Sequence, residues 1–136
     1  AASHAGKVIP NDISLPLAAI PPFLAFMERS LTERWPELQL ETAYFGHLGD
    51  GNLHYNLLQR PQASMPLTTI LQEAIEAWVV EQVIAHGGSP VAEHGIGTKN
   101  LAAFSHYKSP VAIALMRQVK ALLDPHHIMN PSVLLA

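Results

Sequence analysis

The chain contains no cysteine among its 136 residues, and only 14% of its residues are charged. The missing cysteines exclude disulfides, thiolate catalysis and cysteine-bound zinc, and they fit the cytoplasmic location that we expect. In a longer protein the same chain would also fit a peripheral position at a membrane. Lysines and arginines are scattered singly, and the net charge of −3 offers nucleic acid no electrostatic attraction. No apolar run approaches the roughly 20 residues that a membrane-spanning helix needs, so no transmembrane segment is expected.

Hydrophobic residues make up 49% of the chain, which is enough for a folded domain with a core. Their periodicity predicts strands at 8–15, 38–48 and 52–59, and helices at 22–35, 68–85, 98–104 and 110–123. The order strand–helix–strand–strand–helix is most of a ferredoxin-like layer. We therefore expect an α+β fold, an antiparallel sheet with helices on one face, with its final strand missing from the chain.

The segment FGHLGDGNLHYN at 45–56 is the most informative part of the sequence. Asp50-Gly51 is typical of a two-residue hairpin turn, which would place His47 directly opposite His54 with Cβ atoms roughly 4.5–5.5 Å apart. The polar face of this hairpin would also carry Asn52 and Asn56, and the apolar face Leu48, Leu53, Tyr55 and Leu57. The sequence therefore predicts two imidazoles in register on one side of a sheet.

Two neutral imidazoles in register can bind zinc, manganese, iron, cobalt or nickel, and a third ligand must then come from elsewhere. The alternative is a hydrogen-bonded histidine pair on a polar face without a metal. A second segment supplies the adjacent pair Glu93 and His94. In extended backbone their side chains diverge, so one can bind a metal while the other faces a substrate. Without further context an EHG tripeptide is more often an ordinary loop.

Other histidines carry less chemical information. His126-His127 lies in the segment DPHHIMNP, and neighbours on a turn rarely chelate one ion, so we expect a structured turn there. His4, His86 and His106 have no partner in the sequence, and we expect them to be surface or capping residues.

Three segments, HLGDGNLHYN, GGSPVAEHGIGTKN and LMRQVKALLDPHHIMNPSVLL, occur in the order and spacing of a known family. Together they resemble the C-terminal half of the FAD-linked oxidases, which include D-lactate dehydrogenases, glycolate oxidase subunits and D-2-hydroxyglutarate dehydrogenases. The opening NDISLPLAAIPPFLAFM resembles the strand and helix before the family's hairpin. The resemblance implies that residues 1–136 are the C-terminal part of a substrate or cap domain. It also implies a partner, the enzyme's own N-terminal FAD-binding domain, without which the chain would be inactive.

The resemblance also implies a set of site residues. In the family's metal-dependent 2-hydroxy-acid dehydrogenases, the positions matching His47, His54 and Glu93 hold a divalent metal, commonly zinc. The position matching His94 is the general base, which takes the hydroxyl proton while hydride passes from the α-carbon to the flavin. The metal would hold the substrate's carboxylate and hydroxyl oxygens and lower the pKa of the hydroxyl. The expected reaction is the oxidation of a small 2-hydroxy acid such as D-lactate, glycolate or D-2-hydroxyglutarate.

Two further positions follow from the resemblance, and two depart from it. Asn56 lies on the hairpin's polar face and would orient the substrate, and Asn130 matches a position that packs close to FAD. Pro10 stands where relatives that oxidise 2-hydroxy acids often carry a carboxylate-binding lysine, and the nearby Lys7 need not replace it. The tail carries Ser132-Val133 where Gly-Lys is commoner. The first departure bears on which acid is oxidised more than on the reaction.

Two other functions remain open from the sequence. One is a non-catalytic metal-binding or interaction module in which the histidine pair is structural. The other is a flavin enzyme of the same fold that uses no metal. In the flavoenzyme interpretation the chain would expose apolar surface that normally contacts the flavin domain, so we expect self-association, for example as a homodimer.

Overall fold

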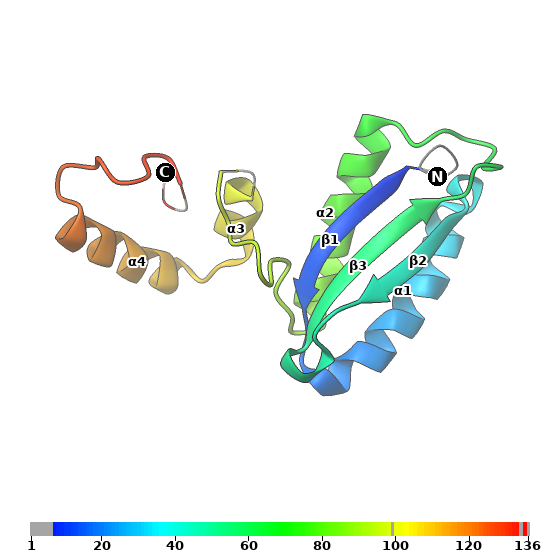
Figure 1. Ribbon diagram of the computed structural model, residues 1–136, viewed down its shortest axis with the longest axis horizontal. Helices are drawn as coiled ribbons and strands as arrows, with labels where there is room; N and C mark the ends of the chain where they lie inside the picture. The colour runs from blue at the N-terminus through cyan, green and yellow to red at the C-terminus, as the bar shows by residue number, and fades with distance from the viewer. Residues whose placement is uncertain (1–6, 99, 134, 136) are drawn as a thin grey trace. The chain divides into compact units, whose positions relative to one another are not determined.

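The structure is a computed structural model that describes residues 7–98, 100–133 and 135 (Figure 1). His4 lies outside the described residues. The chain forms two compact units, 1–94 and 95–136. The first unit contains β1 (Val8–Ser14), η2 (Leu17–Ala19), α1 (Ile20–Arg34), η3 (Pro36–Leu38), β2 (Leu40–Phe45), η4 (Leu48–Asp50), β3 (Asn52–Gln59) and α2 (Thr69–Ala85). The second contains α3 (Leu101–Tyr107) and α4 (Pro110–Leu123).

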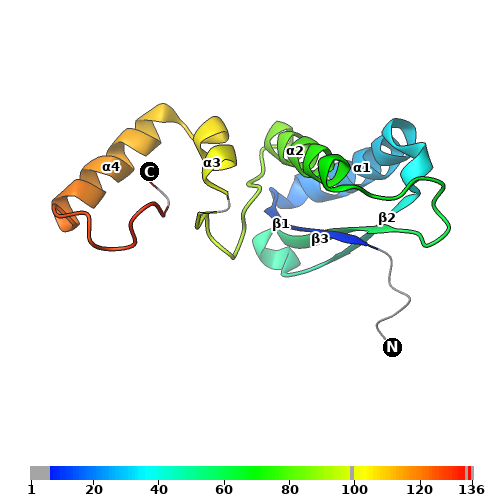
Figure 2. The ribbon, with the colours of Figure 1, turned by 90° about the horizontal axis from the view of Figure 1, so that it is seen from above.

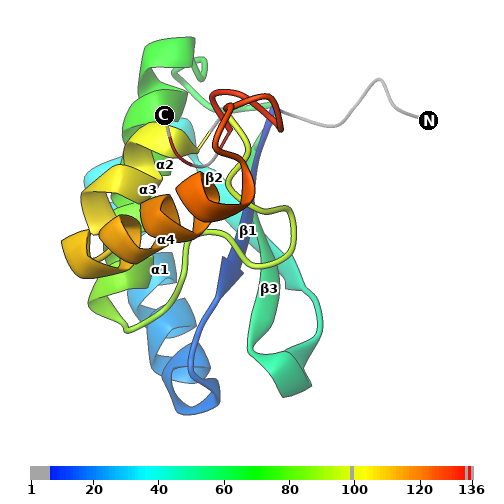
Figure 3. The ribbon, with the colours of Figure 1, turned by 90° about the vertical axis from the view of Figure 1, so that its left-hand side faces the viewer.

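The three strands form one antiparallel sheet in the order β1-β3-β2, and both long helices of the first unit pack on the same face (Figures 2 and 3). This confirms the predicted α+β fold and the order strand–helix–strand–strand–helix. The core fills the space between the sheet and the helices. Its buried residues include Ile9, Ile13, Phe23, Met27, Leu31, Ile75, Val79 and Val83. Among residues 7–94, none of the long helices lies on the other face of the sheet (Figure 2).

The central strand β3 separates apolar from polar side chains as the alternation predicts. Leu53, Tyr55 and Leu57 are completely buried against the helices, and Phe23 packs edge-on against Tyr55 with ring centroids 5.7 Å apart. His54 lies between the first two of these buried positions and is half-buried on the opposite face. The hydrophobic core therefore fixes the direction in which the imidazole of His54 points.

The predicted two-residue turn at Asp50-Gly51 is wrong. Residues 46–51 form a longer connection, and Phe45 rather than His47 lies opposite His54. The register is shifted by two residues, so the face of each β3 side chain is unchanged. His47 lies outside the strand, just before η4, and Leu48 is 58% exposed instead of covering the apolar face.

Local backbone bonds explain why the connection is longer. The amides of Asp50 and Gly51 donate to the carbonyls of His47 and Leu48, which closes the short helical turn η4. Gly46, at φ 152°, and Gly51, at φ 72°, take the chain out of β2 and into β3. The Asp-Gly pair thus ends a helical turn and does not form the centre of a two-residue hairpin.

An irregular segment after α2 covers the outer edge of β1. Gly88 follows the helix, and a Cβ at this position would lie 2.3 Å from the carbonyl oxygen of Ser14. Ser14 and Ser89 then exchange backbone hydrogen bonds, and the amide of Ala92 donates to the carbonyl of Asp12. The fourth strand of a ferredoxin-like layer would lie at this edge. The segment 89–94 takes that place and carries Glu93 and His94 to the sheet.

The helix α4 of the second unit has the predicted bounds and buries none of its side chains. Its apolar residues Val111, Leu115, Val119 and Leu122 recur at helical spacing and are 56–80% exposed. Exposed apolar surface is the feature from which we expect self-association, and the self-association itself stays a prediction.

The tail after α4 is a structured turn, as predicted for His126-His127. The buried carboxylate of Asp124 accepts hydrogen bonds from the amides of Ile128 and Met129 and from the ammonium of Lys120. Both histidines of the turn are exposed. Asp124 therefore holds the turn together, and His127 contributes its backbone amide, which donates to the carbonyl of Asp124 at 3.1 Å.

We expect this turn to loosen in acid. The hydrogen bond from Lys120 and those from the two tail amides lower the pKa of Asp124, although its desolvation opposes them. Stabilisation by a lowered carboxyl pKa is complete above the usual value, near 3.8, and is lost as the pH falls through the lowered pKa. Amide hydrogen exchange at Ile128 and Met129 should accelerate over that range beyond its intrinsic pH dependence. In Asp124→Ala the two amides should exchange rapidly at every pH, and continued protection would contradict the assignment.

Candidate metal and substrate site

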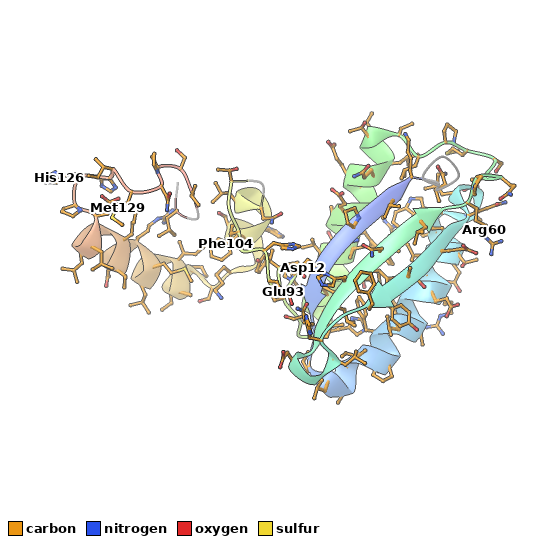
Figure 4. All side chains as sticks on the ribbon, in the orientation of Figure 1. Asp12, Arg60, Glu93, Phe104, His126 and Met129 are labelled. Carbon is orange, nitrogen blue, oxygen red and sulfur yellow. The ribbon has the colours of Figure 1, made fainter. Side chains whose placement is uncertain are left out.

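Four segments of the first unit bring polar side chains to one end of the sheet. Asp12 comes from β1, His54 from β3, His47 from the loop before η4, and Glu93 with His94 from the segment on the edge of β1. Figure 4 shows Asp12 and Glu93 side by side at this end. The sequence predicted four of these residues as a group, and Asp12 was missed.

The geometry of the predicted ligands suits a divalent metal. His47 Nε2 lies 3.6 Å from one carboxylate oxygen of Glu93, and His54 Nε2 lies 3.9 Å from the other. Two ligand atoms at about 2.0–2.1 Å from a tetrahedral zinc ion lie about 3.3 Å from each other. Both pairs are longer than hydrogen bonds and slightly longer than this spacing. The two Nε2 atoms thus face different oxygens of one carboxylate, each at a distance close to that between two ligands of one ion.

The structure also places Asp12 in this cluster. Among the described residues, the group whose ligand atoms all lie within 4.8 Å of one another is Asp12, His54 and Glu93, and the predicted ligand His47 lies outside this group. Asp12 Oδ2 accepts the backbone amides of Glu93 and His94 at 2.9 and 3.1 Å. Burial alone would raise the pKa of Asp12, but these two hydrogen bonds and the imidazoles of His94 and His54 together lower it. Asp12 is therefore a carboxylate that fixes the position of the segment carrying Glu93.

Asn52 orients the same glutamate from the other side. Its side chain is buried at the start of β3, and its amide Nδ2 donates to Glu93 Oε1. The reverse orientation of this amide would set two oxygens against each other, so the carboxylate determines which atom points toward it. The sequence placed Asn52 on the correct face of the hairpin but assigned it no role. Its shared face with His54 was the signal available.

His94 lies beside the ligand cluster and is open to solvent. Residues 92–94 form a bend, so this segment is irregular and the divergence of side chains that extended backbone would give does not apply here. The ring nitrogen His94 Nδ1 lies 3.3 Å from Asp12 Oδ2, and the side chain is 73% exposed. Its ring centroid lies 6.3 Å from that of His54. His94 can therefore meet a molecule that is held at the predicted ligands.

Asn56 lies on the open face of the sheet, two residues along β3 from His54. It is half-buried, and its neighbours in register are Pro10 on β1 and Ala43 on β2. Both neighbours are short side chains, so the amide is not screened by a bulky group. Phe45 packs against the imidazole of His54 with ring centroids 5.1 Å apart. This face thus offers a polar amide and an aromatic ring beside the predicted ligands.

Two other residues singled out in the sequence lie outside this cluster. The ammonium of Lys7 donates a hydrogen bond to the carbonyl of Leu67. Lys7 directly precedes β1, so it lies at the end of that strand opposite Ser14. It therefore does not stand in for the lysine expected at Pro10. Asn130 belongs to the second unit, where it helps to line a largely apolar pocket of about 520 Å³ beside α4.

Comparisons with known proteins agree with the resemblance seen in the sequence. The family described as "FAD linked oxidases, C-terminal domain" matches residues 1–134. D-2-hydroxyglutarate dehydrogenase of Stutzerimonas stutzeri is 36% identical over 126 residues, which are 93% of this chain and 27% of that protein. The mitochondrial enzymes of that name from Bos taurus and Arabidopsis thaliana are 40% and 38% identical over 131 residues, or 96% of this chain and 22% of each relative.

The chain thus spans about a quarter of the length of the curated relatives it matches. Eukaryotic relatives are named as mitochondrial, and the expected cytoplasmic location stays a prediction. Within the part of the chain that the structure describes, none of the helices has the length and apolar character needed to cross a membrane.

Proposed function

We propose that this chain, which belongs to the family of FAD-linked oxidase C-terminal domains, supplies the metal- and substrate-binding part of an FAD-dependent 2-hydroxy-acid dehydrogenase. The observation that carries the proposal is that His47 and His54 each face an oxygen of the Glu93 carboxylate, with the ring of His94 beside that of His54. The names of the relatives, D-2-hydroxyglutarate dehydrogenases, support a 2-hydroxy acid as the substrate. The FAD-binding domain would be a further part of the full protein.

In this proposal His47, His54 and Glu93 hold a divalent metal, with zinc as the expected ion. The ion supplies Lewis-acid chemistry, which lowers the pKa of a hydroxyl beside it. Asn52 and Asp12 hold the glutamate from two sides, so the carboxylate is already in place before anything binds. Little reorganisation is needed when the site is loaded.

His94 acts as the general base. Asp12 lies beside its Nδ1, which leaves Nε2 as the nitrogen that accepts the substrate's hydroxyl proton. Loss of that proton allows hydride to leave the α-carbon, and FAD supplies the hydride acceptor. Asn56, on the open face beside His54, would hold the substrate by hydrogen bonds from its amide. Asn130 is proposed to pack near the flavin and is no part of the ligand cluster.

The test uses the full-length flavoprotein that contains this chain, mixed with D-2-hydroxyglutarate or D-lactate under anaerobic conditions. Bleaching of the flavin absorbance measures hydride transfer directly. We expect His94→Gln to slow this step by about 10²–10⁴-fold, the range for loss of a general base, while bound zinc measured by elemental analysis stays unchanged.

His106→Gln is the matched control, because His106 is an exposed histidine of α3 outside the proposed machinery. It should reduce the flavin at the normal rate. A normal rate in His94→Gln would remove the proposed base. A metal-free protein that reduces its flavin at full rate would instead favour the oxidase without a metal, and a full-length protein without flavin would favour the non-catalytic module.

A further inference from the structure

We propose that Asp12 is a positioning residue that holds both histidines of the site in one tautomer, with the proton on Nδ1 and Nε2 free. The proposal rests on the proposed function for the roles of His54 and His94. It places Asp12 beside the Nδ1 atoms of His54 and His94 and not among the metal ligands.

The first step concerns Asp12 Oδ2. This oxygen accepts two backbone amides, from Glu93 at 2.9 Å and from His94 at 3.1 Å. Amide N–H groups are donors at every pH, so the atom that faces them must remain an acceptor. The side chain of Asp12 therefore cannot turn to offer Oδ2 to another partner without losing two hydrogen bonds.

The second step concerns Asp12 Oδ1. This oxygen is buried and has no hydrogen-bond partner among the described residues. A ring nitrogen, His54 Nδ1, lies 3.6 Å from it. A buried carboxylate oxygen without a partner is costly, and the ring nitrogen that faces it at 3.6 Å needs only a small shift to donate a hydrogen bond to it. His54 Nδ1 should therefore carry the proton and donate it to Oδ1.

The third step separates the two nitrogens of His54. Its Nε2 faces the carboxylate of Glu93, on the side where His47 Nε2 also lies, whereas its Nδ1 faces Asp12. One ring nitrogen thus faces the carboxylate of Glu93, and the other faces the carboxylate of Asp12. A carboxylate on the far nitrogen of a metal-binding histidine fixes the ring's tautomer and raises its basicity as a ligand. The placement of Asp12 matches this outer role.

His94 has the same relation to the carboxylate. Its Nδ1 lies 3.3 Å from Asp12 Oδ2, which favours the proton on Nδ1 and leaves Nε2 as a proton acceptor. One carboxylate would then set the tautomer of the ligand and of the base together. This explains why a charged group is buried at this end of β1.

The test is ¹H–¹⁵N NMR of the chain itself at about pH 8.5, where neutral imidazole tautomers have distinct nitrogen shifts. We expect His54 to carry its proton predominantly on Nδ1 in the unsubstituted, metal-free chain. A predominant proton on Nε2 would overturn the proposal. This measurement needs no variant and no metal.

The variant Asp12→Asn tests the same point, because it should give His54 the opposite tautomer. The two backbone amides require the oxygen of the new amide, so its NH₂ group must face His54 Nδ1. The proton of His54 should then move to Nε2, which blocks the nitrogen proposed to bind metal. We expect the tautomer to change and the zinc affinity to fall about 10–100-fold, the usual effect of losing an outer-shell partner. Asp50→Asn, an exposed aspartate of η4, is the matched control and should change neither.

The outcomes separate the two proposals. Unchanged zinc affinity and tautomer in Asp12→Asn would overturn the positioning role. Complete loss of zinc in Asp12→Asn, together with normal binding in His47→Ala, would make Asp12 a ligand and would also overturn it. A chain that binds no zinc at all would count against the proposed function, while the tautomer of His54 would still decide the role of Asp12.

Discussion

Replacing His54 by alanine should lower the zinc affinity of the chain by about 100-fold or more, which exceeds the effect expected for an outer-shell residue. His54 is half-buried on the central strand, and its Nε2 lies 3.9 Å from Glu93 Oε2. Removing the imidazole leaves a three-ligand site with two ligands and with a carboxylate that has lost its neighbour. Calorimetric titration of zinc into the chelator-stripped chain measures the effect.

His126→Ala is the control for this variant, because it removes an exposed histidine from the tail turn. Its zinc affinity should equal that of the unsubstituted chain. Equal and tight binding in all three proteins would mean that zinc binds at a site that needs neither His54 nor His126, and would remove the histidine pair as the site.

Replacing Gly51 by alanine should lower the free energy of unfolding by about 2–4 kcal/mol, since two unfavourable effects coincide. The residue has φ 72°, and a Cβ there would lie 2.1 Å from the carbonyl oxygen of Leu15. The carbonyl of Gly51 also accepts a hydrogen bond from the amide of Leu15 at 2.9 Å, so the close approach joins two segments of the unit. Urea unfolding followed by circular dichroism gives the size of the effect.

Gly49→Ala is the matched control in the same loop, because a Cβ at this position meets nothing within 4 Å. It should change the free energy of unfolding by only a few tenths of a kcal/mol. Equal stability of the two variants would show that the connection between β2 and β3 adjusts freely, and would weaken the argument that it holds His47 in a defined place.

The elements with strong periodicity could be predicted from the sequence. Strand β3 has the predicted bounds because Leu53, Tyr55 and Leu57 alternate with polar residues, and α4 begins and ends as predicted at Pro110 and Leu123. The order of the elements then leads to the sheet. These features depend on local spacing, which a single sequence contains.

The connection before β3 could not be predicted in the same way. An Asp-Gly pair is compatible with a two-residue turn and with the end of a short helical turn, and tertiary contacts decide between them. Here the contact of Gly51 with Leu15 decides, and Leu15 is distant in sequence. The register error that followed moved His47 out of the strand but left it 3.6 Å from Glu93.

The role of Asp12 could not be predicted from the sequence for a related reason. Its partners Glu93 and His94 are more than 80 residues away, and their pairing depends on a segment that follows no regular pattern. Asp12 lies on β1 opposite His54, a register that requires the sheet order β1-β3-β2. Sequence spacing predicted the ligands on one hairpin and could not reveal the carboxylate on the neighbouring strand.

The most direct test is a crystal structure of the zinc-loaded chain with the ion located by anomalous diffraction at the zinc edge. The proposal predicts one strong peak at about 2.0–2.2 Å from Nε2 of His47, Nε2 of His54 and a carboxylate oxygen of Glu93, with Asp12 outside the coordination sphere. A peak bonded to Asp12 and to Nδ1 of His54, or bonded to none of the three predicted ligands, would contradict it.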